Sequence, residues 1–295
     1  MGCIIPYRGM FSDMTRHLRQ KQLLFSAVFI ISIALSLFRV FIIMHNMEDI
    51  PTVDNTNYYL VDNDNTKYFA ILTAVAVIVF FIISLFLNRI INNELAFGES
   101  SIIFTSSLSG FLLLGCVSYY FLYFKSLPIK LTIFETFIVI FAILSSVYFL
   151  ANASKKAESG NKLIAWLSLA PITFYALRLL NDFIRQSTSP DASSTPYLLL
   201  SIIAFLLFFL SEGKFLSGTG SVRLYMFFGF CAILFSLIYS LPVLVLTSFW
   251  VLPGNYGILF SAADLTLALY VSAKICNLKC RECEKTELSG IKDKA

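Results

Sequence analysis

The chain has 295 residues, of which 58% are hydrophobic and only 14% are charged, and its mean hydropathy is +0.79. Soluble domains are roughly 45–50% apolar and about 25% charged, so this composition excludes an ordinary soluble domain. The net charge of +4 comes from basic residues spread over many segments. Because they form no basic patch studded with aromatic residues, we expect no nucleic-acid partner. The sequence predicts an all-α membrane protein.

Eight long apolar runs predict a polytopic bundle of about eight transmembrane helices, because about 20 residues are needed to cross the hydrocarbon core. In the sixth run, the strictly apolar part is short, and Glu212 and Lys214 follow it directly. We count this run as a span whose two charged side chains extend to the inner membrane surface. The runs comprise residues 23–44, 68–87, 101–124, 131–151, 163–183, 197–216, 224–252 and 256–275.

The distribution of basic residues predicts the orientation of the spans, because short cytoplasmic loops carry an excess of Lys and Arg. With both termini in the cytoplasm, the outer side carries only Lys67, Lys125, Lys130 and Arg185, and the other basic residues outside the spans are cytoplasmic. The first apolar run is too long for a cleaved signal peptide. We therefore expect a multi-pass protein of the plasma (cell) membrane that retains this first span.

The spans divide into two halves with similar landmarks. In each half an early span carries an arginine, a Leu-Pro pair marks a later outer turn, and the last span carries a single acid. This order favours two parallel four-helix repeats, and chance similarity between apolar segments is the alternative. The expected segments are a basic cytoplasmic leader (1–22), half 1 (23–151), a cytoplasmic linker (152–162), half 2 (163–275) and a basic cytoplasmic tail (276–295).

Four charged residues within the spans form the predicted site: Arg39, Glu135, Arg178 and Asp264. Ionisable groups in hydrocarbon are rare and usually face a protein interior or a wet cavity. At 1.5 Å per residue, all four lie in the outer half of the membrane, with Asp264 deepest at about 12 Å. We expect the two arginines to face the two acids in a network that binds or relays a small solute or ion.

Simpler structural interpretations exist for both arginines. Arg39 is close enough to the outer surface for its long side chain to reach water. Arg178 shares a helical face with Asn181 and Asp182, so an ion pair between Arg178 and Asp182 within one helix is also expected. The acids have shorter side chains and therefore need a partner, a proton or a ligand.

Two prolines within the spans support the site hypothesis. Pro171 and Pro242 each lack a backbone donor and can bend their helices. Carbonyl groups freed at such bends can bind ions or substrate groups where they line a cavity. The alternative is that these bends serve packing alone.

Most catalytic and metal-binding motifs are missing from the sequence. His17 and His45 are the only histidines, and no H-E-x-x-H, G-x-S-x-G or nucleotide-binding pattern is present. Cys276, Cys280 and Cys283 are one ligand short of a closed zinc site. Free thiols are therefore the expected state, with zinc binding as the alternative, and we expect no cofactor.

These features favour a membrane protein that binds or transports a small solute or ion through a polar site in the outer half of the bilayer. The first alternative is a non-catalytic sensor or assembly component, in which a protein partner binds the cytoplasmic tail. The second alternative is a membrane enzyme that works without histidine. The sequence leans against an enzyme, and the lipid bilayer is the one partner common to all three.

Overall fold

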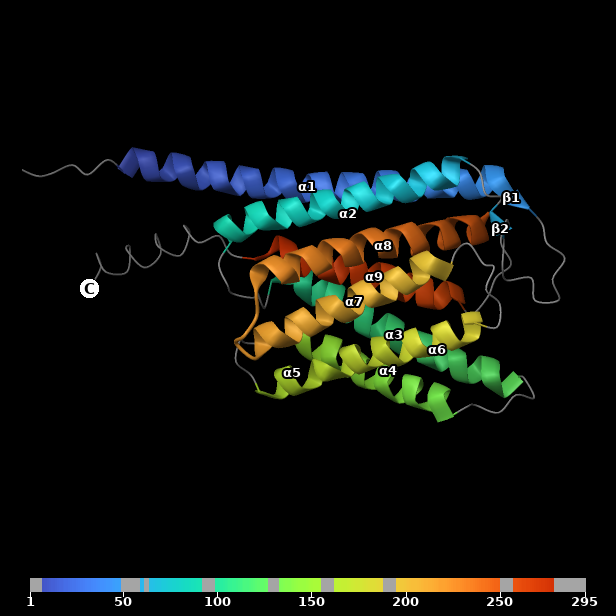
Figure 1. Cartoon of the computed structure of the whole chain (residues 1–295). Helices are drawn as coiled ribbons and strands as arrows, with labels where there is room; N and C mark the ends of the chain where they lie inside the picture. The colour runs from blue at the N-terminus through green and yellow to red at the C-terminus, as the bar shows by residue number, and fades with distance from the viewer. Residues whose placement is uncertain are drawn as a thin grey trace, which may run out of the picture.

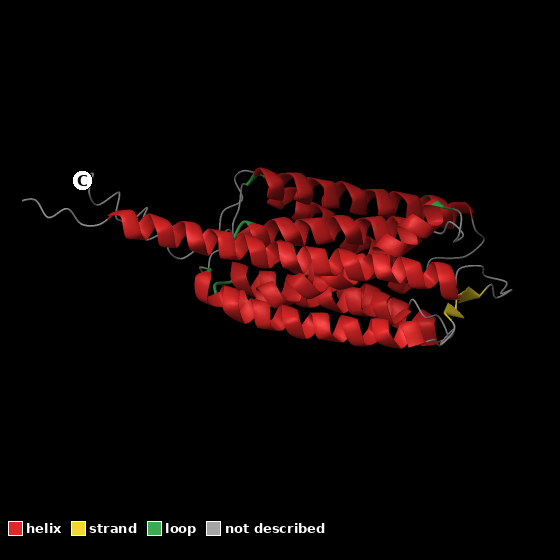
Figure 2. Cartoon of the chain, turned by 90° about the horizontal axis from the view of Figure 1, so that it is seen from above, coloured by secondary structure: helices red, strands yellow, loops and turns green. Residues whose placement is uncertain are grey.

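The computed structural model is an elongated bundle of helices (Figures 1 and 2). Eight of its helical segments are long and apolar enough to cross a membrane, which confirms the predicted number of spans. The chain is therefore an all-helical, multi-pass membrane protein in its overall architecture. The structure describes residues 7–48, 59–60, 64–91, 99–126, 133–154, 162–187, 195–249 and 257–278.

The first helix, α1 (Tyr7–Asn46), has 40 residues and is about 60 Å long. It extends past the rest of the bundle at its N-terminal end (Figures 1 and 2). Much of the expected leader is therefore continuous with the first span. At the other end of α1, β1 (Met47–Glu48) pairs antiparallel with β2 (Tyr59–Leu60) before α2 (Asp64–Ile90) begins.

The fifth span consists of two helices. It follows α3 (Ser100–Ser126) and α4 (Ile133–Asn152), and is divided into α5 (Lys162–Leu167) and α6 (Leu169–Ser187). The ring of a proline clashes with the carbonyl group four residues earlier, and for Pro171 that residue is Leu167, where α5 ends. The break therefore lies where Pro171 is expected to disturb the helix.

The last three helices are α7 (Thr195–Leu216), α8 (Val222–Ser248) and α9 (Gly257–Cys276). A tight turn ends α7 at Gly218, which has a φ of 81°. The amide of Gly218 donates to the carbonyl of Phe215, and that of Thr219 donates to Lys214, both at 3.0 Å. Glycine suits this left-handed position because it has no Cβ. In contrast, α8 continues through the buried Pro242.

Helices α8 and α9 form the centre of the bundle. In their most apolar segments, 67% and 61% of residues are buried, compared with 33% to 44% in the other spans. Helix α8 packs against α1, α2, α7 and α9, while α9 also packs against α3, and α4 lies between α3 and α6. Helices of the first half thus pack directly on helices of the second half. The internal repeat remains a prediction.

Serine hydroxyls join neighbouring helices through backbone carbonyl groups. Ser36 of α1 donates to the carbonyl of Leu237 in α8 at 2.7 Å, and Ser106 of α3 donates to that of Phe149 in α4 at 2.5 Å. Such small polar residues allow membrane helices to approach closely and add hydrogen bonds between them. These hydrogen bonds therefore tie α1 to α8 and α3 to α4.

Candidate functional site

Arg178 of α6 and Asp264 of α9 form a buried ion pair. The Nη1 and Nη2 atoms of Arg178 donate to Oδ1 and Oδ2 of Asp264 at 2.7 and 2.8 Å. The two residues are only 7% and 1% exposed. Such two-point pairing is stronger and more directional than a single hydrogen bond. Both residues belong to the predicted site, and the fold brings them together.

Neighbouring side chains complete the surroundings of this pair. The hydroxyl of Tyr175 donates to Oδ1 of Asp264 at 3.0 Å, so the carboxylate accepts three hydrogen bonds. The ring of Phe260 lies 5.1 Å from the Arg178 guanidinium carbon, and Ser236 donates to the backbone carbonyl of Asp264 at 3.0 Å. Groups from α6 thus hold the Asp264 carboxylate. A hydrogen bond from α8 holds the backbone of α9 at the same residue.

The expected pair between Arg178 and Asp182 is also present, but it is longer. Nε of Arg178 lies 3.8 Å from Oδ2 of Asp182, whose side chain is 21% exposed. Asn181 donates to Oδ1 of Asp182 at 3.4 Å. Asp182 is therefore more exposed than Asp264, and Arg178 interacts with both acids.

Arg39 and Glu135 lie apart from each other. Arg39 is only 2% exposed, and its guanidinium carbon lies 3.8 Å from the ring centre of Tyr197 and 5.7 Å from that of Phe69. The simpler interpretation that its side chain reaches water is therefore wrong, because aromatic rings of α2 and α7 cover it. Glu135 is buried in the first turn of α4, on the opposite side of the bundle from α1 (Figure 1). Of the four predicted site residues, the fold brings Arg178 and Asp264 into direct contact.

A second buried ion pair, which was not predicted from the sequence, joins α7 and α9. Oε1 of Glu212 in α7 lies 3.5 Å from Nζ of Lys274 in α9, and it accepts a 2.8 Å hydrogen bond from the hydroxyl of Tyr270. Both charged side chains are almost completely buried. The expectation that Glu212 reaches the membrane surface is therefore wrong, whereas Lys214 is exposed.

A sequence signal for this second pair existed. Glu212 and Lys274 stand near the ends of the sixth and eighth apolar runs. In the predicted orientation both of these ends are cytoplasmic, so opposite charges are expected at the same depth. Pairing with Lys274 explains why the Glu212 carboxylate turns inward, since a buried charge is stabilised by an opposite one.

Helix α9 carries one member of each ion pair. Asp264 and Lys274 are ten residues apart, which corresponds to about 15 Å along the helix. Each ion pair also has its own tyrosine partner. Tyr175 donates to Asp264, and Tyr270 donates to Glu212. The bundle therefore contains two separate polar sites at different levels of one central helix.

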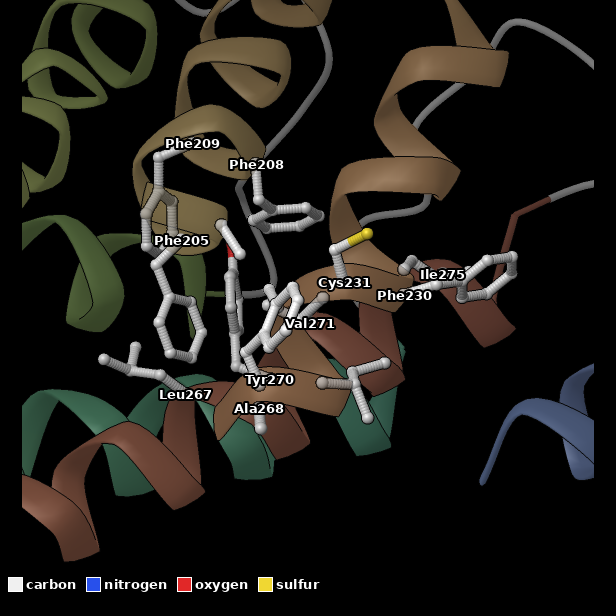
Figure 3. Packing of buried hydrophobic residues seen from close by; sticks show 14 of the residues in the cluster. Phe205, Phe208, Phe209, Phe230, Cys231, Leu267, Ala268, Tyr270, Val271 and Ile275 are labelled. Atoms are coloured by element: carbon white, nitrogen blue, oxygen red, sulfur yellow. The ribbon is translucent and has the colours of Figure 1, made fainter. Parts of the chain in front are cut away.

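Aromatic rings fill the space between these two sites. Tyr175 stacks on Phe205 and Phe209 with centroid distances of 5.2 and 5.7 Å. The ring of Phe149 makes T-shaped contacts with the rings of Phe209 and Tyr270, with centroid distances of 5.7 and 5.2 Å. Figure 3 shows part of this packing, in which rings of α7 face Tyr270 on α9. The two polar sites are thus bridged by a continuous chain of rings from Tyr175 to Tyr270.

The cysteine cluster is only partly described by the structure. Cys276 is exposed at the end of α9 as a free thiol, and Cys280 and Cys283 lie outside the described residues. Within the described ranges, no group of three or more His, Cys, Asp or Glu side chains could hold a metal ion. Zinc binding by the three cysteines stays an alternative prediction.

No protein-family model, curated protein or solved structure matches this chain. The function is therefore inferred from the buried charges and their surroundings. Of these, Arg178 and Asp264 are joined by two short hydrogen bonds, one to each carboxylate oxygen.

Proposed function

We propose that the protein binds or transports a small solute or ion at the site formed by Arg178 and Asp264. The observation that carries this proposal is their fully buried, two-point ion pair between two membrane-spanning helices. Charged groups inside membrane proteins commonly mark substrate or ion pathways. In the orientation expected from the basic residues, this site lies in the outer half of the cell membrane and both termini are cytoplasmic.

The pair itself restricts how a ligand can bind. Both carboxylate oxygens of Asp264 already accept hydrogen bonds from Arg178, so a ligand that pairs with Asp264 at both oxygens displaces the guanidinium. A cationic group would then replace Arg178 at Asp264, and an anionic group would bind the released Arg178. A zwitterion would satisfy both charges, while the nearby Asp182 favours ligands that carry a positive group.

Arg39 and Glu135 enter the proposal as separate buried charges. Both are at least 95% covered, on helices that pack against different neighbours. The three hydrogen bonds to the Asp264 carboxylate come from Tyr175 and Arg178. We propose that Arg39 and Glu135 stabilise the helices around the pathway, α1 and α4, while Arg178 and Asp264 contact the ligand.

The proposal is tested by ligand-dependent thermal unfolding of the purified full chain in detergent. The probes are sodium chloride, potassium chloride and glycine, which represent a cation, a second cation and a zwitterion. A ligand present at 100 times its Kd stabilises a protein by about 2.7 kcal/mol. We expect stabilisation of the natural chain by at least one probe, and loss of that response in Asp264→Asn.

A matched control is Asp64→Asn, which changes an exposed acid in the first turn of α2. It should respond to the probe like the natural chain. If no probe stabilises the natural chain, or if Asp264→Asn responds equally well, the proposed site is wrong.

A further inference from the structure

Arg178 is in contact with two acids, whereas Asp264 is in contact with one cation. The Nη1 and Nη2 atoms of Arg178 donate to Asp264 at 2.7 and 2.8 Å, and its Nε atom lies 3.8 Å from Oδ2 of Asp182. In the part of the chain that the structure describes, the other partner of the Asp264 carboxylate is the uncharged hydroxyl of Tyr175. If the pair opens, Arg178 therefore still has an acid beside it, but Asp264 requires a new cation.

Asp182 is placed to receive the guanidinium group of Arg178. It stands four residues later in α6, so the two side chains share one face of the helix. Asn181 donates to Oδ1 of Asp182, while Oδ2 is the oxygen next to Nε of Arg178. The Asp182 side chain is also more exposed than that of Asp264. Movement of Arg178 from Asp264 to Asp182 therefore exchanges a buried acid for a more exposed one.

The present position of the guanidinium has the chemistry of a site for a planar organic cation. It is bounded by both oxygens of Asp264 and by the rings of Phe260 and Tyr175, whose centres lie 5.1 and 5.9 Å from the guanidinium carbon. Aromatic rings within about 6 Å attract a cation, and two carboxylate oxygens match two parallel N–H groups. A metal ion has no N–H groups, and an anion is repelled by the carboxylate.

We propose that the ligand of this site is a small organic cation with a guanidinium or amidinium group. The ligand takes the place of the Arg178 guanidinium at Asp264, while Arg178 moves to Asp182. Each of the three charged side chains then has an opposite charge beside it both before and after binding. This inference rests on the proposed function, because it names the class of ligand that Asp264 binds.

Thermal unfolding of the purified full chain in detergent tests the ligand class. The probes are methylguanidinium chloride, N-methylurea and sodium chloride at the same low concentration. N-methylurea resembles methylguanidinium in shape but has no charge, and sodium chloride supplies the same ionic strength. We expect methylguanidinium to raise the unfolding temperature several-fold more than either of the others. An equal or larger rise with N-methylurea or sodium chloride would overturn the proposal.

The variant Arg178→Ala gives a second measurement, because it removes the guanidinium and leaves Asp264 in place. Its unfolding temperature should be lower than that of the natural chain, since a buried acid has lost its cation. We expect methylguanidinium to restore much of this loss, and N-methylurea to restore none of it. If the two probes act equally, or if neither restores stability, the site does not accept a guanidinium group.

The role of Asp182 is tested with Asp182→Asn, in which the displaced arginine has no carboxylate to receive it. We expect a several-fold weaker apparent affinity for methylguanidinium in this variant, and no response in Asp264→Asn. Asp64→Asn is the matched control and should respond like the natural chain, because Asp64 is exposed in α2. An unchanged affinity in Asp182→Asn would overturn the proposed movement of Arg178.

The same measurements distinguish this inference from the proposed function. If sodium chloride, potassium chloride or glycine stabilises the natural chain but not Asp264→Asn, while methylguanidinium has no effect, Asp264 binds a ligand and the inferred ligand class is wrong. If none of the probes stabilises the natural chain, both are wrong.

Discussion

Arg178 and Asp264 hold each other through two hydrogen bonds, one to each carboxylate oxygen, although they are 86 residues apart in the sequence. Changing either residue alone leaves a buried charge without compensation. We expect Arg178→Met or Asp264→Leu to lower the free energy of unfolding by about 3–5 kcal/mol. Chemical or thermal unfolding of the purified chain measures this loss.

The double variant Arg178→Met with Asp264→Leu separates charge from packing. Replacing a buried ion pair by apolar side chains of similar size is often neutral or stabilising. We expect the double variant to recover most of the stability lost in the single variants. If the losses of stability in the two single variants simply add in the double variant, the two residues are not electrostatically coupled.

Asp182 should contribute much less than Asp264 to stability. Its carboxylate lies 3.8 Å from Nε of Arg178, one helical turn away, and it is partly exposed to solvent. Ion pairs of this kind typically contribute less than about 1 kcal/mol. The unfolding of Asp182→Asn should therefore resemble that of the natural chain, and a loss as large as for Asp264→Leu would contradict the assigned geometry.

Lys21 fixes the first helix to the end of the last one. Its ammonium group donates to the backbone carbonyls of Cys276 at 2.8 Å and Leu278 at 2.6 Å, beside the C-terminal end of α9. A cation is favourable there because the helix dipole is negative at that end. We expect Lys21→Met to lower the free energy of unfolding by about 1.5–3 kcal/mol.

Arg19→Met is the matched control for Lys21, because Arg19 is exposed two residues earlier in α1. Surface substitutions usually change stability by less than about 0.5 kcal/mol. Equal effects of the two variants would mean that the contact of Lys21 with α9 does not contribute to folding.

Two glycines of α3 offer a test of helix packing. A Cβ at Gly110 would lie 2.9 Å from Cγ of Leu150 and 3.2 Å from the backbone oxygen of Ser146, both in α4. A Cβ at Gly115 would meet nothing within 4 Å. We expect Gly110→Ala to cost about 1–3 kcal/mol through overpacking. Gly115→Ala should be neutral or stabilising by up to about 1 kcal/mol, because alanine favours helix.

Unfolding of the two glycine variants under identical conditions gives the comparison. If both change stability by the same amount, the close approach of α3 and α4 at Gly110 is wrong.

The eight spans were predictable because apolar length is a local property of the sequence. It does not depend on which helices pack against each other. Arg178 and Asp264 were also recognisable, since charged residues are rare in such segments. The sequence was compatible with several pairings of these residues, however, because the pairing depends on which face of α6 meets α9. The division of the fifth span followed from Pro171, whose effect is again local.

The remaining features depend on contacts between distant segments. A simpler interpretation of the sequence placed the Arg39 side chain at water, but its burial depends on Tyr197, which is 158 residues further along the chain and becomes a neighbour only after folding. Glu212 and Lys274 were missed because each stands at the end of an apolar run, where a charged side chain normally reaches the membrane surface. Only the packing of α7 on α9 turns them toward each other.

The central claim is that Asp264 contacts the ligand. It is tested most directly by the probe-induced rise in the unfolding temperature, measured for the natural chain, Asp264→Asn and Asp64→Asn with sodium chloride, potassium chloride and glycine. The account predicts that at least one probe stabilises the natural chain and Asp64→Asn, while Asp264→Asn remains folded but does not respond. An equal rise for Asp264→Asn, or no rise for the natural chain with any of the three probes, would contradict it.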